Sequence, residues 1–161
     1  MRYFFDTEFD AQNERVTLLS IGIVAEDGRE FYAVNSEADH SKCSQFVRDN
    51  VLPELGTDFD MTRAEIRDSV RKFIGDDPHP LFFAYFSAYD WVLFCQLWGI
   101  LVDLPQGWPQ FCMDLMQISV HVNCYSRPPQ LAHRHNALSD ARWNFELYKH
   151  LKHYSGVPAI F

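Results

Sequence analysis

The 161-residue sequence contains no Cys-x-x-Cys pair, and its four cysteines (Cys43, Cys95, Cys112 and Cys124) are scattered along the chain. Closely spaced cysteine pairs are typical of structural zinc sites and of disulfide frameworks, so the sequence favours neither. Positive charge is also scarce: the sequence has 14 Lys and Arg residues against 22 Asp and Glu residues, which gives a net charge of −8. Proteins that hold long duplex nucleic acid are normally basic. A phosphate-ester substrate would therefore make a short contact, with a bound metal supplying positive charge locally.

We expect no apolar leader, because the acidic residue Asp6 lies so near the start of the sequence. The hydrophobic run 81–102 carries Asp90 near its middle, and a central Asp costs about 3 kcal/mol in a bilayer. A buried strand that leads into a buried helix explains this run better than a membrane span. No repeat, linker or low-complexity segment interrupts the chain, and 47% of it is hydrophobic. We expect one cytoplasmic domain over residues 1–161, with a sizeable core and no membrane contact.

Hydrophobic patterns predict an α/β fold. Residues 2–9, 16–25 and 30–34 read as strands, and Asp27-Gly28 between the last two predicts a hairpin turn, so the chain opens with an antiparallel meander. Apolar residues at helical spacing predict helices over 41–55 and 62–74. Further along we expect strands at 81–86 and 109–115 and helices at 90–98 and 136–154, the last one capped by Asn136. These elements form a mixed sheet of five strands flanked by helices.

Asp6 and Glu8 raise a question of electrostatics, because residues two apart on a strand point to the same face. Two neighbouring carboxylates repel each other, and a divalent cation would offset that repulsion. Asp90 follows a buried strand, where open α/β sheets bind ligands, and His135 and Asp140 span the start of the last helix. A solvated strand face, a helix cap and the helix dipole could each explain one of these residues. Their combination points instead to a metal site.

These residues resemble the three motifs of the DEDDh 3′–5′ exonucleases, the DnaQ and RNase T type. The motifs here are Asp6-x-Glu8, Asp90 and His135-x4-Asp140. The segments "RYFFDTEF", "SIGIVAEDGREFYAV", "AYDWVLFCQLWG" and "HNALSDAR" are most similar to the small stand-alone bacterial 3′–5′ exoribonucleases of this superfamily, and they span residues 1 to about 148. The resemblance implies an RNase H-like fold, with an antiparallel meander followed by parallel strands. It also implies hydrolysis from RNA 3′ ends that releases nucleoside 5′-monophosphates.

Hydrolysis of a phosphodiester by this superfamily implies two divalent cations, Mg²⁺ or Mn²⁺, held by carboxylate oxygens. We assign Asp6 as the bridging ligand, with Glu8 and Asp140 completing the site nearest the attacking water. Asp90 supports the second cation. His135 is the general base, because an imidazole titrates near neutral pH and can accept a proton from water. His133 is the alternative base.

The sequence departs from the superfamily at two places near the expected terminal nucleotide. Phe9-Asp10-Ala11 stands where Thr-Gly often follows the first two acids, and Phe86 stands where Asn is frequent. We expect substrate contacts from Thr7 and from three aromatic residues, Phe9, Phe86 and Trp91, whose rings could stack on the terminal bases. Core packing is the alternative explanation for these rings.

Other functions compete with RNA hydrolysis at a single-stranded 3′ end or 3′ overhang. One is the same chemistry on DNA, as in proofreading and repair exonucleases, since no residue in the sequence is seen to read a 2′-hydroxyl. A second is a non-catalytic adaptor that binds nucleic-acid ends, and a third is a phosphoesterase for small nucleotides. Homodimers are common in the superfamily, so a homodimer is an alternative to a monomer.

Overall fold

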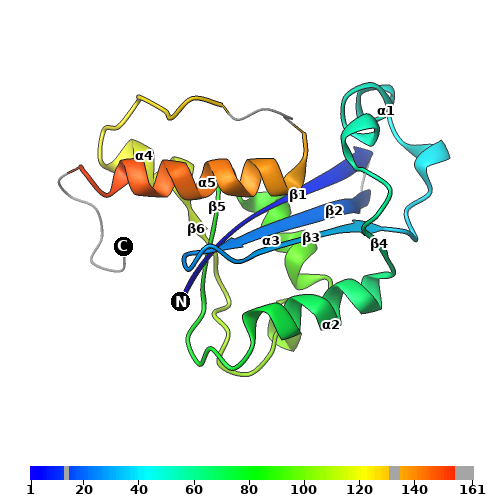
Figure 1. Cartoon of the computed structure of the whole chain (residues 1–161), viewed down its shortest axis with the longest axis horizontal. Coiled ribbons are helices and arrows are strands. Elements are labelled where there is room, and N and C mark those ends of the chain that lie inside the picture. The colour runs from blue at the N-terminus through cyan, green and yellow to red at the C-terminus, as the bar shows by residue number, and fades with distance from the viewer. Residues whose placement is uncertain (13–14, 131–134, 155–161) are drawn as a thin grey trace.

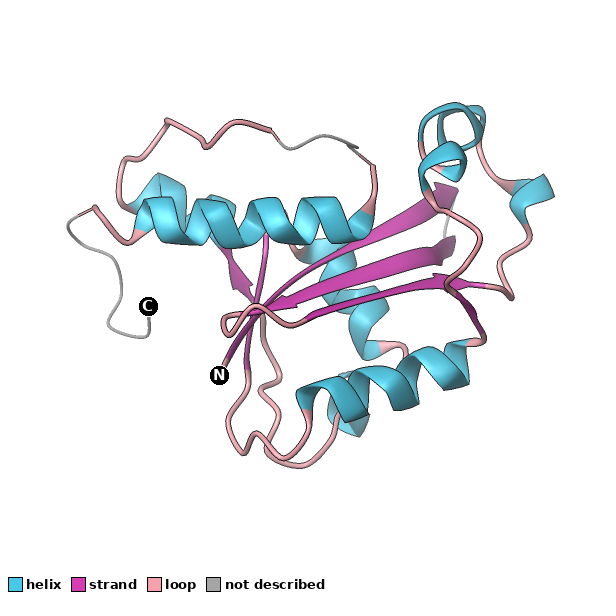
Figure 2. Cartoon of the chain, viewed as in Figure 1, coloured by secondary structure: helices cyan, strands magenta, loops and turns pink. Residues whose placement is uncertain are grey.

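A six-stranded mixed sheet forms the centre of the structure, a computed structural model that describes residues 1–12, 15–130 and 135–154. Its strand order is β4-β3-β2-β1-β5-β6. The first three strands, β1 (Arg2–Gln12), β2 (Arg15–Ala25) and β3 (Glu30–Asn35), pair antiparallel. The short strands β4 (Asp60–Met61), β5 (Leu81–Ala84) and β6 (Met113–Asp114) each pair parallel to a neighbour (Figure 2). The α/β class and the change from antiparallel to parallel strands are as predicted.

The predicted number of five strands is wrong, because β4 adds a sixth. This strand pairs with the end of β3 through the register Val34↔Asp60 and Asn35↔Met61. The backbone amides of Val34 and Ser36 donate to the carbonyls of Phe59 and Met61, each at 2.9 Å. The Asp-Met dipeptide shows no strand pattern of its own, so only its contact with β3 makes it a strand.

Helices cover both faces of the sheet (Figure 1). On one face lie α4 (Leu115–His121) and α5 (Ala137–Leu151), whose apolar side chains form a core with Phe4 and Phe83. On the other face α2 (Arg63–Ile74) and α3 (Ala88–Cys95) pack against Tyr3, Phe5 and Phe82. Strand β1 therefore sends alternate side chains into two cores. In the described part of the chain, no helix has the length and apolar character needed to cross a membrane.

The helix predicted over residues 41–55 is three short helices. These are the 3₁₀ turn η1 (His40–Lys42), α1 (Gln45–Asn50) and a second 3₁₀ turn η2 (Leu52–Glu54); a third 3₁₀ turn, η3 (Leu101–Asp103), follows α3. The Ser44 side chain caps α1 by accepting from the Val47 amide. Pro53 ends the α-helical hydrogen bonding because it has no N–H to donate.

Helix α5 is close to the predicted range. Its cap is Asn136, as predicted, and the side-chain oxygen of Asn136 accepts from the Ser139 amide at 3.1 Å. The predicted hairpin turn between β2 and β3 is present, with Gly28 at φ 90°. The capped start of α5 positions one of the carboxylates described next, because α5 lies across β1 and β2.

Candidate active site

Three carboxylates meet between the central strand and the last helix. Asp6 and Glu8 come from β1 and Asp140 from the first turn of α5, and one ligand atom of each lies within 4.8 Å of the others. Asp6 and Glu8 share the face of Phe4, whose ring packs on those of Phe145 and Tyr148 of α5 at 4.8 and 4.9 Å. The β1–β2 register shifts immediately after Glu8. Such bulges bend a strand and occur often beside active sites.

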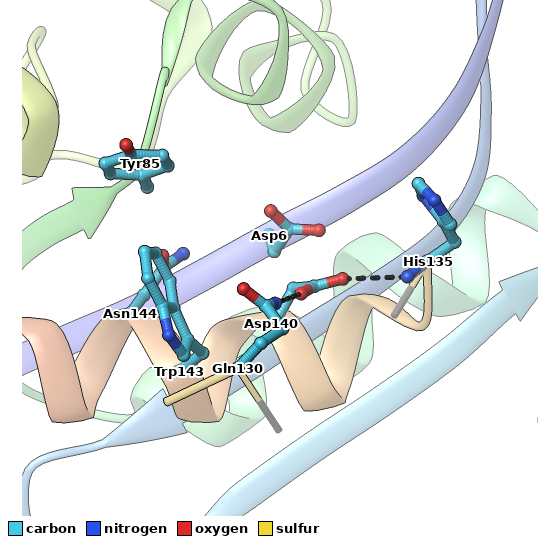
Figure 3. Close-up of a pocket in the computed structure, with 7 residues that line it drawn as sticks. All are labelled: Asp6, Tyr85, Gln130, His135, Asp140, Trp143 and Asn144. Carbon is cyan, nitrogen blue, oxygen red and sulfur yellow. Dashed lines mark hydrogen bonds between the residues drawn. The ribbon is translucent and has the colours of Figure 1, made fainter. Parts of the chain in front are cut away.

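Asp140 is held in place by the chain that precedes α5. The backbone amide of His135 donates to Asp140 Oδ2 at 3.1 Å, and Gln130 Nε2 donates to Oδ1 at 3.1 Å (Figure 3). His135 has φ 64°, a left-handed conformation that His adopts more readily than most residues. Its ring meets Phe46 of α1 edge-on, with centroids 5.7 Å apart. His135 therefore binds the Asp140 carboxylate through its backbone amide, and its imidazole takes no part in that hydrogen bond.

Asp90 lies beside this group but outside its tightest part. Asp90 is the third residue of α3 and is only 5% exposed. Its Oδ1 accepts hydrogen bonds from the Thr7 amide at 2.9 Å and from Thr7 Oγ1 at 2.6 Å. Thr7 lies between Asp6 and Glu8 on β1, and its side chain points to the opposite face of the strand. Its two hydrogen bonds therefore hold the Asp90 carboxylate in place.

Burial and mutual repulsion raise the pKa values of these acids. The pKa of Asp6 is well above its usual value because of burial and then the negative charges of Asp90, Glu8 and Asp140. Burial, followed by the charges of Asp140 and Asp90, raises the pKa of Glu8 to about 8. Burial also raises the pKa of Asp90 to about 6, although the hydrogen bonds from Thr7 lower it. Hard oxygen donors held at such a negative potential suit Mg²⁺ or Mn²⁺.

The carboxylates should make the metal-free protein less stable as the pH rises. Glu8 binds its proton more tightly in the folded state than in the unfolded chain, so its contribution to stability is complete below about pH 4.5 and is lost toward pH 8. Thermal unfolding in EDTA should show Tm falling across this window, and Glu8→Gln should flatten the fall. A wild-type Tm in EDTA that rises from pH 5 to 8 would contradict the clustering of these acids.

A cavity of about 180 Å³ opens beside the carboxylates. It is lined by Asp6, Tyr85, Gln130, His135, Asp140, Trp143 and Asn144 (Figure 3). Pockets for drug-sized ligands usually measure roughly 300–1,000 Å³. This cavity is therefore of a size for cations and one phosphate group, with the rest of any polymer outside it.

The family model described as the 3′–5′ exoribonuclease Rv2179c-like domain matches residues 1–151. The chain belongs to this family. Two curated relatives are each 42% identical to it over 148 residues, covering 88% of this chain and 88% of the relative. They are the 3′–5′ exoribonucleases MT2234.1 and Rv2179c from two strains of Mycobacterium tuberculosis.

All five predicted catalytic residues lie within the range that the Rv2179c-like model matches. The structure brings Asp6, Glu8 and Asp140 together and places His135 and Asp90 at their edges. His133, the alternative base, lies outside the described residues.

The four predicted substrate contacts of this Rv2179c-like domain lie in different surroundings. Thr7 is 4% exposed, and its hydroxyl group bonds to Asp90. Trp91 stacks on Phe94 against the core, with ring centroids 5.4 Å apart. This contact agrees with core packing, the alternative to substrate binding. Phe86 is 61% exposed. Half-buried Phe9 pairs with the ring of Tyr89, an exposed aromatic residue that the sequence analysis did not single out.

Two polar residues of the site were missed from the sequence. Gln130 lies in a loop without a periodic pattern, so nothing marked it as a partner of Asp140. Asn144 did carry a signal, because it is a polar residue one turn after Asp140 on the apolar face of α5. It is 1% exposed and donates to the Phe5 carbonyl at 2.9 Å. The pairing of β1 with β5 ends at Phe4. The side-chain amide of Asn144 binds the carbonyl of the next residue of β1, Phe5.

Proposed function

We propose that this chain is a divalent-metal-dependent 3′–5′ exoribonuclease of the DEDDh type, which hydrolyses RNA from its 3′ end and releases nucleoside 5′-monophosphates. One observation carries the proposal. Asp6, Glu8 and Asp140 present ligand atoms within 4.8 Å of one another, in a chain that belongs to the Rv2179c-like family. The curated relatives bear the name 3′–5′ exoribonuclease.

The donor set fits two Mg²⁺ or Mn²⁺ ions. The negative charges of Asp90, Glu8 and Asp140 all act on Asp6. Asp6 is therefore the carboxylate that we assign to both cation sites. Asp6 would bridge the two ions, Glu8 and Asp140 would complete one site, and Asp90 would support the other. When bound, such ions neutralise charge on the phosphoryl oxygens and on the leaving oxygen. Without positive charge, four acids would repel a phosphate, so the cations also explain how a chain of net charge −8 binds RNA.

His135 is the residue that we assign to proton transfer. Its backbone amide orients Asp140, and its ring is held by one edge-on contact with Phe46. In the proposed reaction the ring accepts a proton from the attacking water. The same residue thus positions a ligand and removes a proton.

A single-stranded 3′ end is the substrate that suits the site. The cavity is small, whereas exposed aromatic rings, those of Phe86 and Tyr89, lie near Asp90 on the chain. Rings of this kind stack on unpaired bases without reading their sequence. A free end with splayed bases can therefore place its terminal phosphodiester at the carboxylates.

Matched RNA and DNA oligonucleotides with a 5′ label test the proposal. With Mg²⁺ or Mn²⁺, the RNA should shorten stepwise from its 3′ end and yield 5′-mononucleotides. EDTA should stop the reaction, and added Mn²⁺ should restore it. Full activity in EDTA would overturn the metal assignment. Faster cleavage of the DNA would replace RNA by DNA as the substrate, efficient cutting of circular RNA would show an endonuclease, and no cleavage of either polymer would favour an adaptor.

A further inference from the structure

We infer that Gly22 is a positioning residue that sets the distance between Asp6 and Asp140 and thereby the affinity of the site for divalent cations. Gly22 has no side chain with which to bind substrate or metal. Its influence is steric, and it acts through the backbone of α5. The inference rests on the proposed function, since it concerns the same cation site.

Gly22 lies directly opposite Asp6 in the antiparallel pair of β1 and β2. A Cβ atom at this position would lie 2.3 Å from the amide nitrogen of Leu138 and 2.4 Å from the carbonyl carbon and oxygen of Ala137. These are backbone atoms of the first turn of α5, which cannot rotate away as a side chain would. The absence of a side chain therefore allows α5 to begin in contact with the sheet, beside Asp6.

Other contacts hold the same turn of α5 in place, one of them to η2. Asn136 Nδ2 donates to the Glu54 carbonyl at 2.9 Å, and Ala137 is fully buried. About two turns after Asn136, Asn144 fastens the helix to the Phe5 carbonyl of β1. Asp140 lies between these attachments, so the position of the helix backbone fixes the position of its carboxylate.

A methyl group at Gly22 would force the start of α5 away from β2 by about 1 Å to restore ordinary contact. Metal–ligand distances vary by only about 0.2 Å, and Mg²⁺ demands near-ideal octahedral geometry. Asp140 would move with the helix, whereas Asp6 and Glu8 would stay with β1. Their shared site would widen, and one cation would no longer contact all three carboxylates at its preferred distances.

Titration calorimetry with MnCl₂ on the full chain, without RNA, tests this role. Gly22→Ala should bind Mn²⁺ about 10–100-fold more weakly than wild type, the loss typical of residues that orient ligands. In RNA hydrolysis, the Mn²⁺ concentration for half-maximal rate should rise by a similar factor, with much of the maximal rate recovered at saturating Mn²⁺. A purely structural defect would lower the active fraction without moving that concentration.

Val70→Ala is the matched control, because Val70 is fully buried in the core on the opposite face of the sheet. It should lower Tm and leave the Kd for Mn²⁺ unchanged. Equal Mn²⁺ affinity in wild type and Gly22→Ala overturns the positioning role alone. Absence of Mn²⁺ binding by wild type overturns the proposed function and this inference together.

Asn144→Ala decides the matter if Gly22→Ala does not fold. This change removes the second attachment of α5 near Asp140 and inserts no atom into the sheet. It should weaken Mn²⁺ binding in the same direction, because alanine has no amide to donate to the Phe5 carbonyl. Unchanged Mn²⁺ affinity in Asn144→Ala would then overturn the inference.

Discussion

Asp6→Asn should lower the rate of nucleotide release at least about a thousandfold, because the bridging position would lose its charge and with it about 4 kcal/mol of transition-state stabilisation. The same variant should have a higher Tm than wild type in EDTA at pH 8. The pKa of Asp6 is raised by burial and by three neighbouring charges, so its ionised form opposes folding. Single-turnover rates and thermal unfolding with and without Mn²⁺ measure both effects.

Asp10→Asn is the matched control on the same strand. Asp10 is 7% exposed, but its carboxylate accepts from the Ser44 amide and the Gln12 side chain, and its pKa is lowered. The control should lose stability and keep activity and Mn²⁺ binding, the reverse of Asp6→Asn. If Asp6→Asn retained a rate within tenfold of wild type, Asp6 would not be a bridging ligand.

His135→Asn should lower the rate about 10²–10⁴-fold, the usual worth of a general base, while Mn²⁺ binding persists. Asn is the informative replacement because His135 has φ 64°, and Asn tolerates this left-handed backbone well. The backbone amide that orients Asp140 remains in place. Loss of rate therefore reports the imidazole, not a displaced ligand.

His135→Ala is the companion variant and adds a conformational cost, since alanine is strained at positive φ. A rate lower in His135→Ala than in His135→Asn, with weaker Mn²⁺ binding, would measure that displacement. Calorimetry and single-turnover rates on both variants separate the two contributions. A near-normal rate in His135→Asn from pH 6 to 9 would exclude His135 as the base.

The long elements were predictable because their patterns are local. Strands β1 to β3 carry β-branched and aromatic residues over several positions, and α5 has both a cap at Asn136 and an apolar stripe. Strands β4 and β6 contain two residues each. A dipeptide has no period, so its pairing depends entirely on which neighbour the fold brings alongside.

The residues of the candidate site could be named from the sequence, but their geometry could not. The spacing of Asp6 and Glu8 on a strand predicted their common face, and the places of Asp90, His135 and Asp140 beside predicted elements marked them as candidates. The resemblance then joined all five into one set of motifs. The bond from Thr7 to Asp90 could not be anticipated, because the two residues are far apart in the chain. Nor could the close approach of α5 to Gly22, since a glycine within a strand has several possible reasons.

Phe86 shows that a residue's backbone and its side chain can favour different amino acids. Its φ of 56° lies in the left-handed region, and the Ser87 amide that follows is fixed by Asp114 Oδ2 at 3.0 Å. Asn or Gly would occupy this conformation at less cost, and the ring, 61% exposed, returns little through burial. A phenylalanine at this position therefore adds little to the stability of the fold, and its exposed ring lies where another molecule can contact it.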